Sequence, residues 1–228
     1  MNFERFQDNL DWIVLLFLFF LAVVDYFLVF IWVESFREFT LSGHPIFYMV
    51  PFAFTTYVCF GVVLISAILY LRTKEGIYDL LVLSGTKVGL LAGTITIVVG
   101  MIWSYVEWGY FWQWEARQTA TLLMWILYAA LLIVRGMFEE KDQEKRATVS
   151  AAFGIAAAPS IPLSNFIVGA LHPAPQQTSL GSGVGNVLAL NFLFVLLVAI
   201  FLLVITYRTA KVESALREIR MKKMAEWS

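Results

Sequence analysis

Six apolar segments, each about as long as a membrane-spanning helix, dominate this chain. They cover residues 12–33, 50–71, 84–106, 118–138, 148–169 and 186–207. A helix needs about 20 apolar residues to cross a bilayer, and it satisfies its backbone hydrogen bonds within the lipid. The segments are continuously apolar, whereas the strands of a membrane β-barrel alternate between apolar and polar residues. The sequence therefore predicts an all-α fold, a polytopic membrane bundle of six transmembrane helices.

Composition supports lipid as the solvent for most of the chain. Charged residues make up 14% of the sequence, against about 25% in a soluble domain. The single cysteine, Cys59, lies inside an apolar run, so an intrachain disulfide is excluded and a buried, inert thiol is expected. Gly85, Gly89 and Gly93 recur at every fourth position, a spacing that favours close packing of membrane helices. The net charge of −1 gives no indication of a nucleic-acid partner.

The positive charges separate between the two sides of the predicted bundle. Of the 16 lysines and arginines, only Arg37 and Arg117 fall in the loops of one side, which leaves 14 (16 − 2) on the other. The positive-inside rule then places both termini in the cytoplasm, in a multi-pass protein of the cell membrane (the inner or plasma membrane). Residues 1–208 are expected to form one membrane domain and residues 209–228 a basic cytoplasmic tail. The tail is either a helix on the inner membrane surface or a solvated helix laced with charges.

Two histidines, His44 and His172, are the only ones in the chain. Both fall in outer loops, each just outside a predicted span and directly before a proline, which favours an extended backbone. Histidine is a common metal ligand and a frequent axial ligand of haem. Two imidazoles at matched depth would be able to clamp a flat metallated ligand between them. Two loop histidines also fall on one face by chance, so the pair alone leaves ligation open. A single zinc site is less suited, because zinc usually takes three or four protein ligands.

A tryptophan-rich outer loop, at about residues 103–119, favours the hypothesis that the two histidines ligate a flat metallated ligand. It contains four of the chain's eight tryptophans. Tryptophan also gathers at membrane interfaces, but such a belt is spread over all helix ends, whereas this cluster occupies a single loop. Flat aromatic side chains form an apolar platform that stacks on a planar macrocycle. Arg117, which follows Glu115 within the loop, is a permanent cation that binds carboxylates bidentately.

The stretch from Trp108 to Thr119, WGYFWQWEARQT, resembles the WWD motif of haem-handling proteins in cytochrome c maturation, whose pattern is close to WGxxWxWDxRxT. Phe111 stands where another tryptophan is frequent, Glu115 replaces the usual aspartate, and Gln118 replaces a usual leucine. Thr119 is either the N-cap of the fourth span or a functional residue. Six spans with only two outer histidines are most similar to the CcmC branch of this family, because CcmF and CcsA have more spans and further histidines.

The resemblance implies a specific function and site. The protein would hold haem b as cargo at the outer face of the membrane and present it to the haem chaperone CcmE, with CcmA, CcmB and CcmD as complex partners. No bond is made or broken by the chain itself, so it is not expected to be an enzyme and has no catalytic residues. His44 and His172 would be the axial metal ligands. The other residues implied at the site form the aromatic platform and tight turn, orient their neighbours or meet the propionates: Trp108, Gly109, Phe111, Trp112, Trp114, Glu115, Arg117 and Arg37.

Two other classes of function remain open on the sequence. One is an electron-carrying membrane subunit with b-type haem, although such proteins usually place bis-histidine ligands inside helices and no predicted span contains a histidine. The other is a small-molecule transporter with an aromatic belt. In that case Asp25, inside the first span, is the best candidate for a functional group, because intramembrane charges are costly and usually face the bundle interior. Otherwise Asp25 forms hydrogen bonds within the bundle.

Overall fold

The computed structural model describes residues 2–32, 45–139, 142–164 and 182–226, and its regular structure in these ranges is entirely helical. Five helices are long and apolar enough to cross a membrane, which confirms the predicted all-α, multi-pass bundle. The elements, in chain order, are α1 (Asn2–Phe27), η1 (Leu28–Trp32), α2 (Ile46–Thr73), α3 (Gly76–Trp108), α4 (Ala116–Gly136), α5 (Gln143–Ala157), α6 (Ser160–Pro162) and α8 (Ser182–Glu226).

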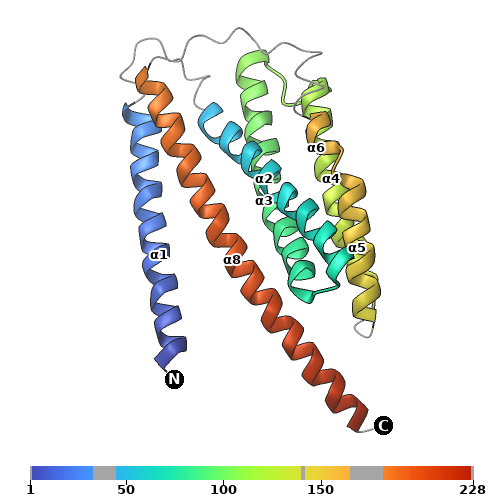
Figure 1. Ribbon diagram of the computed structural model, residues 1–228. Helices are drawn as coiled ribbons and strands as arrows, with labels where there is room; N and C mark the ends of the chain where they lie inside the picture. Colours follow the sequence, from blue (N-terminus) through green and yellow to red (C-terminus); the bar gives the residue numbers. More distant parts are fainter. Residues whose placement is uncertain (1, 33–44, 140–141, 165–181, 227–228) are drawn as a thin grey trace.

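The antiparallel hairpin of α2 and α3 forms the centre of the bundle, with α4 and α5 on one side and α8 and α1 on the other (Figure 1). The hairpin turn is tight because Lys74 ends α2 in the left-handed conformation, with φ of 60°, and its backbone N–H donates to the Tyr70 carbonyl at 2.8 Å. The Lys74 side chain donates to the Thr148 hydroxyl at 3.0 Å. The turn is therefore also fastened to α5.

The fifth predicted span, residues 148–169, is not one continuous helix in its described part. Helix α5 ends at Ala157, and α6 follows after Pro159. A proline lacks the N–H that a helix interior needs and its ring clashes with the preceding turn. The break therefore occurs at the proline, while the two short helices together still follow the length of α4 (Figure 1).

Both ends of the chain lie at the same end of the bundle, opposite the connection between α3 and α4 (Figure 1). The two terminal helices are joined near this end by an ion pair, in which Arg208 donates to both Asp11 carboxylate oxygens at 3.0 Å. Helix α8 continues without a break through most of the predicted tail. A helix that continues a span leaves the bilayer along the span's own axis, which favours the solvated, charge-laced form of the tail; an i,i+4 ion pair between Arg217 and Glu213 at 3.7 Å fits that form.

The core of the bundle depends on small residues of α3 that face α2. A β-carbon added to Gly89 would lie 2.5 Å from the Phe60 ring, and one added to Gly85 would lie 3.0 Å from Val63. Phe60 itself stacks on Tyr128 of α4, with ring centroids 3.5 Å apart and planes 2° from parallel. Cys59 is 1% exposed, so it is a buried thiol as expected. The glycine spacing therefore sets how closely α2 and α3 approach, as predicted.

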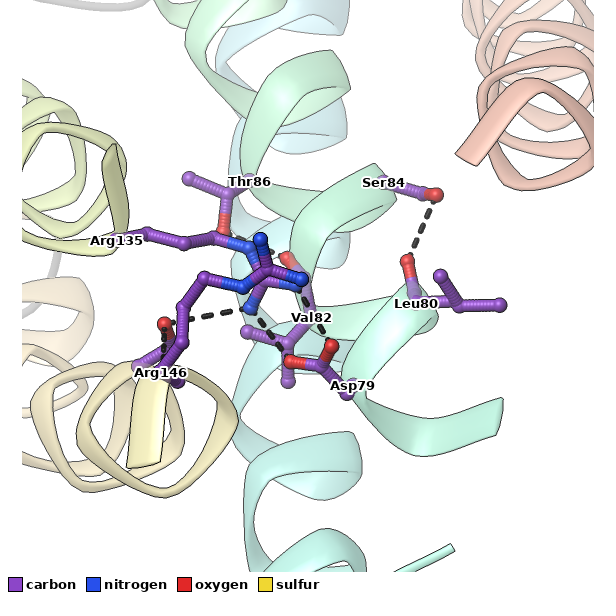
Figure 2. Close-up of polar contacts among 8 residues, drawn as sticks. Asp79, Leu80, Val82, Ser84, Thr86, Arg135 and Arg146 are labelled. Carbon is purple, nitrogen blue, oxygen red and sulfur yellow. Dashed lines mark hydrogen bonds and ion pairs between the residues drawn. The ribbon is translucent and has the colours of Figure 1, made fainter. Parts of the chain in front are cut away.

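A buried ion pair ties α3, α4 and α5 together at the end of the bundle that holds the hairpin turn. The Arg135 guanidinium binds the Asp79 carboxylate with two parallel hydrogen bonds of 2.5 and 2.7 Å, and Figure 2 shows the two groups facing each other. Arg135 also donates to the Ser150 hydroxyl at 3.3 Å. Asp79 lies in the first turn of α3 and Arg135 in the last turn of α4. Each charge therefore also interacts favourably with the partial charge of the opposite sign at its own helix end.

Candidate functional site

The tryptophan-rich loop begins where α3 ends. Gly109 adopts the left-handed conformation, with φ of 79°, and its N–H donates to the Tyr105 carbonyl at 2.8 Å. This is the tight turn expected of the glycine, because side chains with a β-carbon rarely adopt such a φ. The Ser104 hydroxyl donates to the Tyr110 carbonyl at 2.8 Å, and this contact folds the chain back over the end of α3. The start of the loop is therefore fixed by two hydrogen bonds to the helix that it leaves.

Three aromatic pairs order the loop. Trp103 and Trp108 meet edge to face, with centroids 4.8 Å apart and planes at 74°. Tyr105 stacks on Phe111 at 4.4 Å, with planes 10° apart. Trp112 and Trp114 meet edge to face at 5.9 Å and 84°. Aromatic pairs in these geometries contribute roughly 0.5–1.5 kcal/mol each beyond the area they bury. The loop is thus an ordered aromatic assembly and not a set of separate interfacial side chains.

Trp114 is held in an unusual backbone conformation. Its φ is +56°, in a region where a bulky residue is a genuine outlier and which costs of the order of 1–3 kcal/mol. The neighbouring Gln113 N–H donates to the Gln118 side-chain oxygen at 3.2 Å, which fastens this part of the loop to the first turn of α4. Trp114 is 74% exposed. Strained residues of this kind cluster at ligand sites, where the surrounding structure holds a side chain ready for contact.

An open groove of about 570 Å³ runs beside Trp114. Binding sites for small molecules and cofactors are commonly of about 300–1,000 Å³. Leu163, at the end of α6, forms one wall; the next stretch of chain leads to His172. The remaining lining residues come from the tryptophan-rich loop and the N-terminal half of α4: Gln113, Glu115, Ala116, Thr119, Ala120 and Leu123.

Two polar atoms at this end of the bundle are buried without a hydrogen-bond partner among the described residues. They are the Trp112 indole nitrogen and the Thr119 hydroxyl oxygen. An unsatisfied buried polar group costs roughly 1–3 kcal/mol, so such atoms are uncommon away from functional sites. Thr119 is also one of the residues that line the groove.

The charged residues of the motif do not pair with each other. No ion pair joins Glu115 to Arg117; Glu115 is instead the residue that precedes α4, and its carbonyl accepts the Thr119 N–H at 2.9 Å. The N-cap assignment of Thr119 is therefore wrong, because α4 begins at Ala116 and Thr119 lies within its first turn. Arg117 is exposed at the same helix end. Among the described residues no carboxylate forms an ion pair with its guanidinium, which is therefore accessible to an external carboxylate.

The predicted axial ligands His44 and His172, together with Arg37, lie outside the described residues. Of the remaining predicted site residues, Trp114 and Glu115 line the groove, whereas Trp108, Gly109, Phe111, Trp112 and Arg117 are not among its lining residues. Sequence reasoning missed Ser104, Leu163 and the contact made by Gln118. The sequence held one indication of the Gln118 contact: Gln118 replaces a leucine of the family pattern. A polar residue at a usually apolar position indicates a specific hydrogen bond.

Asp25 lies away from the groove, inside the bundle. It is 6% exposed, and the Asn191 amide nitrogen donates to its two oxygens at 3.0 and 3.2 Å. The predicted alternative of hydrogen bonding within the bundle is therefore confirmed. This leaves the transporter hypothesis without its best candidate for a free intramembrane charge.

Residues 1–227 match the family described as heme exporter protein C, CcmC. The chain belongs to the CcmC family. The match extends over nearly the whole chain, so the membrane bundle and the tryptophan-rich loop both fall within it.

Individual relatives agree with the family match. The chain is 30% identical over 135 residues to a putative CcmC-like mitochondrial protein of cytochrome c biosynthesis from Marchantia polymorpha. The aligned residues make up 59% of this chain and 56% of that protein. It is 24% identical over 181 residues to heme exporter protein C of Bradyrhizobium diazoefficiens, covering 78% of this chain and 68% of that protein. A cytochrome c biogenesis protein CcsA from a Synechococcus species is 35% identical over 63 residues, 28% of this chain and 21% of that protein.

Proposed function

We propose that this protein binds haem b as cargo at the outer face of the cell membrane and presents it to the haem chaperone CcmE during cytochrome c maturation. The single observation that carries the proposal is the ordered aromatic loop of a CcmC-family chain, set beside an open groove of about 570 Å³. The proposal needs no catalytic residue, because the haem is held and passed on without a covalent step. CcmA, CcmB and CcmD are the expected partners of the complex.

Each part of the haem would have a partner in the chain. Trp114 and Trp112 provide exposed and half-buried aromatic surface for the macrocycle. Arg117, which is exposed and has no ion-pair partner in the part of the chain that the structure describes, would bind one propionate, and Arg37 the other. His44 and His172 would ligate the iron from opposite faces. Within the described residues, the aromatic and apolar groups at this end, together with the single cation Arg117, suit an amphiphilic, planar, anionic ligand.

The positions of the chain ends support the proposed orientation. Both termini lie at the end of the bundle opposite the aromatic loop. If the termini are cytoplasmic, as the distribution of cations predicts, the groove faces outward. Membership of the CcmC family favours haem held as cargo over haem that carries electrons between fixed partners.

The aromatic platform can be tested with two exposed tryptophans at opposite ends of the protein. Trp114 is 74% exposed and Trp12 is 67% exposed. Replacing Trp114 by alanine removes stacking surface and is expected to weaken haem binding roughly tenfold or more, measured by titration of purified apoprotein with haem. Trp12→Ala removes a side chain of equal size and similar exposure far from the loop and is expected to leave the affinity unchanged. Equal affinities for the two variants would contradict a platform at Trp114.

A further inference from the structure

One hydrogen bond holds the middle of the tryptophan-rich loop against α4. The Gln113 backbone N–H donates to the Gln118 side-chain oxygen at 3.2 Å. The other hydrogen bonds of the connection between α3 and α4, residues 109–115, involve its first two residues and its last one. In the part of the chain that the structure describes, residues 111–114 form no hydrogen bond besides that of Gln113. The backbone directly before Trp114 is therefore held in place through Gln118.

This hydrogen bond supports a backbone conformation that is unfavourable for Trp114 by itself. The φ of Trp114 is +56°, a region that costs free energy for any bulky side chain. The ring of Trp114 contacts that of Trp112 edge to face, with centroids 5.9 Å apart. The cost of the backbone conformation is of the same order as the net gain from one hydrogen bond or one aromatic pair. Loss of the hydrogen bond therefore gives other conformations of Trp114 a comparable free energy.

Gln118 supports Trp114 from outside the groove. Trp114 is one of the lining residues of the groove, whereas Gln118 is not. The lining residues of α4 have the spacing of a single helix face: Ala116, Thr119, Ala120 and Leu123. Gln118 follows the first of them by two positions, about 200° around the helix axis, and so lies on the other side of α4. Its side chain therefore influences a ligand in the groove only through the loop.

We propose that Gln118 is a positioning residue for Trp114. By accepting the Gln113 N–H, it keeps the exposed indole in one position beside the groove and thereby raises the affinity for the ligand. An aromatic ring that is already held in place loses less conformational freedom when a ligand binds. The inference rests on the proposed function for the identity of the ligand, which is haem. Leucine, the usual residue of the family pattern at this position, cannot accept the hydrogen bond, so the contact is a feature of this chain.

Three variants of α4 separate this role from a general effect on the helix. Gln118→Leu removes the acceptor, and because leucine is a good helix former and the position is half-buried, the fold is expected to be kept. Gln118→Glu retains an acceptor oxygen at the same distance from the backbone. Thr121→Val is the control, because it removes a hydroxyl that donates within the same helix, to the Arg117 carbonyl at 2.9 Å, and leaves the loop untouched.

The first readout does not depend on haem. The eight tryptophans are replaced by 5-fluorotryptophan, and the ¹⁹F resonance of Trp114 is identified by its absence from Trp114→Phe. We expect one narrow Trp114 resonance in the parent, in Gln118→Glu and in Thr121→Val, and a broadened, split or shifted one in Gln118→Leu. A Trp114 resonance in Gln118→Leu with the shift and width of the parent resonance would overturn the inference, whatever the fate of the haem proposal.

The second readout is the affinity for haem, measured by titration of purified apoprotein. Gln118→Leu is expected to weaken binding about fivefold, the effect of one lost hydrogen bond, whereas Gln118→Glu and Thr121→Val should bind haem as the parent does. If Gln118 acts through Trp114, Gln118→Leu causes no further loss in a Trp114→Ala background. An equal loss in both backgrounds would contradict a role exerted through Trp114.

Failure of the inference and failure of the proposed function give different results. If the parent takes up no haem, the proposed function fails, while the ¹⁹F spectrum still decides whether Gln118 holds Trp114 in one position. If the parent binds haem and Gln118→Leu binds it equally well, the proposed function stands and the positioning role of Gln118 is refuted.

Discussion

Replacing Arg135 by alanine is expected to lower the free energy of unfolding by about 3–5 kcal/mol. The substitution leaves the Asp79 carboxylate, whose side chain is only 13% exposed, without its cation. A charge in that position cannot be solvated well, so the loss reflects the stranded carboxylate more than the strength of the pair itself. Ser150, which also accepts a hydrogen bond from Arg135, loses a partner in the same variant. Thermal unfolding in detergent measures the effect.

Two further variants separate this explanation from a simple loss of charge. Arg135→Leu combined with Asp79→Leu removes both charges and should recover most of the stability, because replacing a buried pair with apolar residues is often neutral or stabilising. Lys145→Ala breaks an exposed ion pair with Asp142, in which the lysine side chain is 76% exposed, and should change stability by less than about 1 kcal/mol. Equal losses for Arg135→Ala and Lys145→Ala would rule out the buried pair as a main stabilising contact.

The second large effect is expected from Gly89→Val. A β-carbon at this position would lie 2.5 and 2.7 Å from two atoms of the Phe60 ring and 3.1 Å from the Cys59 side chain. Moving the ring away would disturb its stacking on Tyr128, whose ring centroid lies 3.5 Å from that of Phe60. Helices α2 and α3 must therefore separate, at a cost of about 1–3 kcal/mol or more. The same unfolding measurement applies.

Gly61→Ala is the matched control for Gly89→Val. Gly61 lies in α2, and an added β-carbon there meets nothing within 4 Å. Alanine is a better helix former than glycine by roughly 1 kcal/mol, so Gly61→Ala should be neutral or slightly stabilising. A Gly89→Val variant as stable as the parent would show that the α2–α3 contact adjusts more easily than the stacked ring allows.

The helical membrane fold could be predicted from the apolar segments, but the residues at which the helices begin and end could not. The third span was expected to begin at residue 84, whereas α3 begins at Gly76. Hydropathy marks the part of a helix that lies in hydrocarbon, and the helical hydrogen bonds continue into polar sequence beyond it. Asp79 for this reason falls outside the predicted spans, between residues 71 and 84, and Arg135 is only one of the 14 cations counted on the predicted cytoplasmic side. Their pairing joins residues far apart in the chain, and no local pattern indicates it.

The aromatic loop shows the same limit at the site. The motif predicted a tight turn at Gly109 and an aromatic platform formed by the tryptophans, because both depend on residue type and order. The left-handed conformation of Trp114 depends instead on how the loop is fastened to α4 through Gln118. Leu163 enters the groove only because α6 packs beside α4. Contacts of this kind arise from the packing of helices and require the structure.

The visible absorption spectrum of the purified protein, compared with that of the double variant His44→Ala, His172→Ala, tests the central claim most directly. The account predicts a Soret band in the parent after expression with haem supply, with the features of a bis-histidine haem. It predicts loss of most of the bound haem in the double variant, while the helical content measured by circular dichroism stays the same. A double variant that retains the haem content and spectrum of the parent would contradict ligation by these histidines, and a parent that takes up no haem would contradict the proposed function.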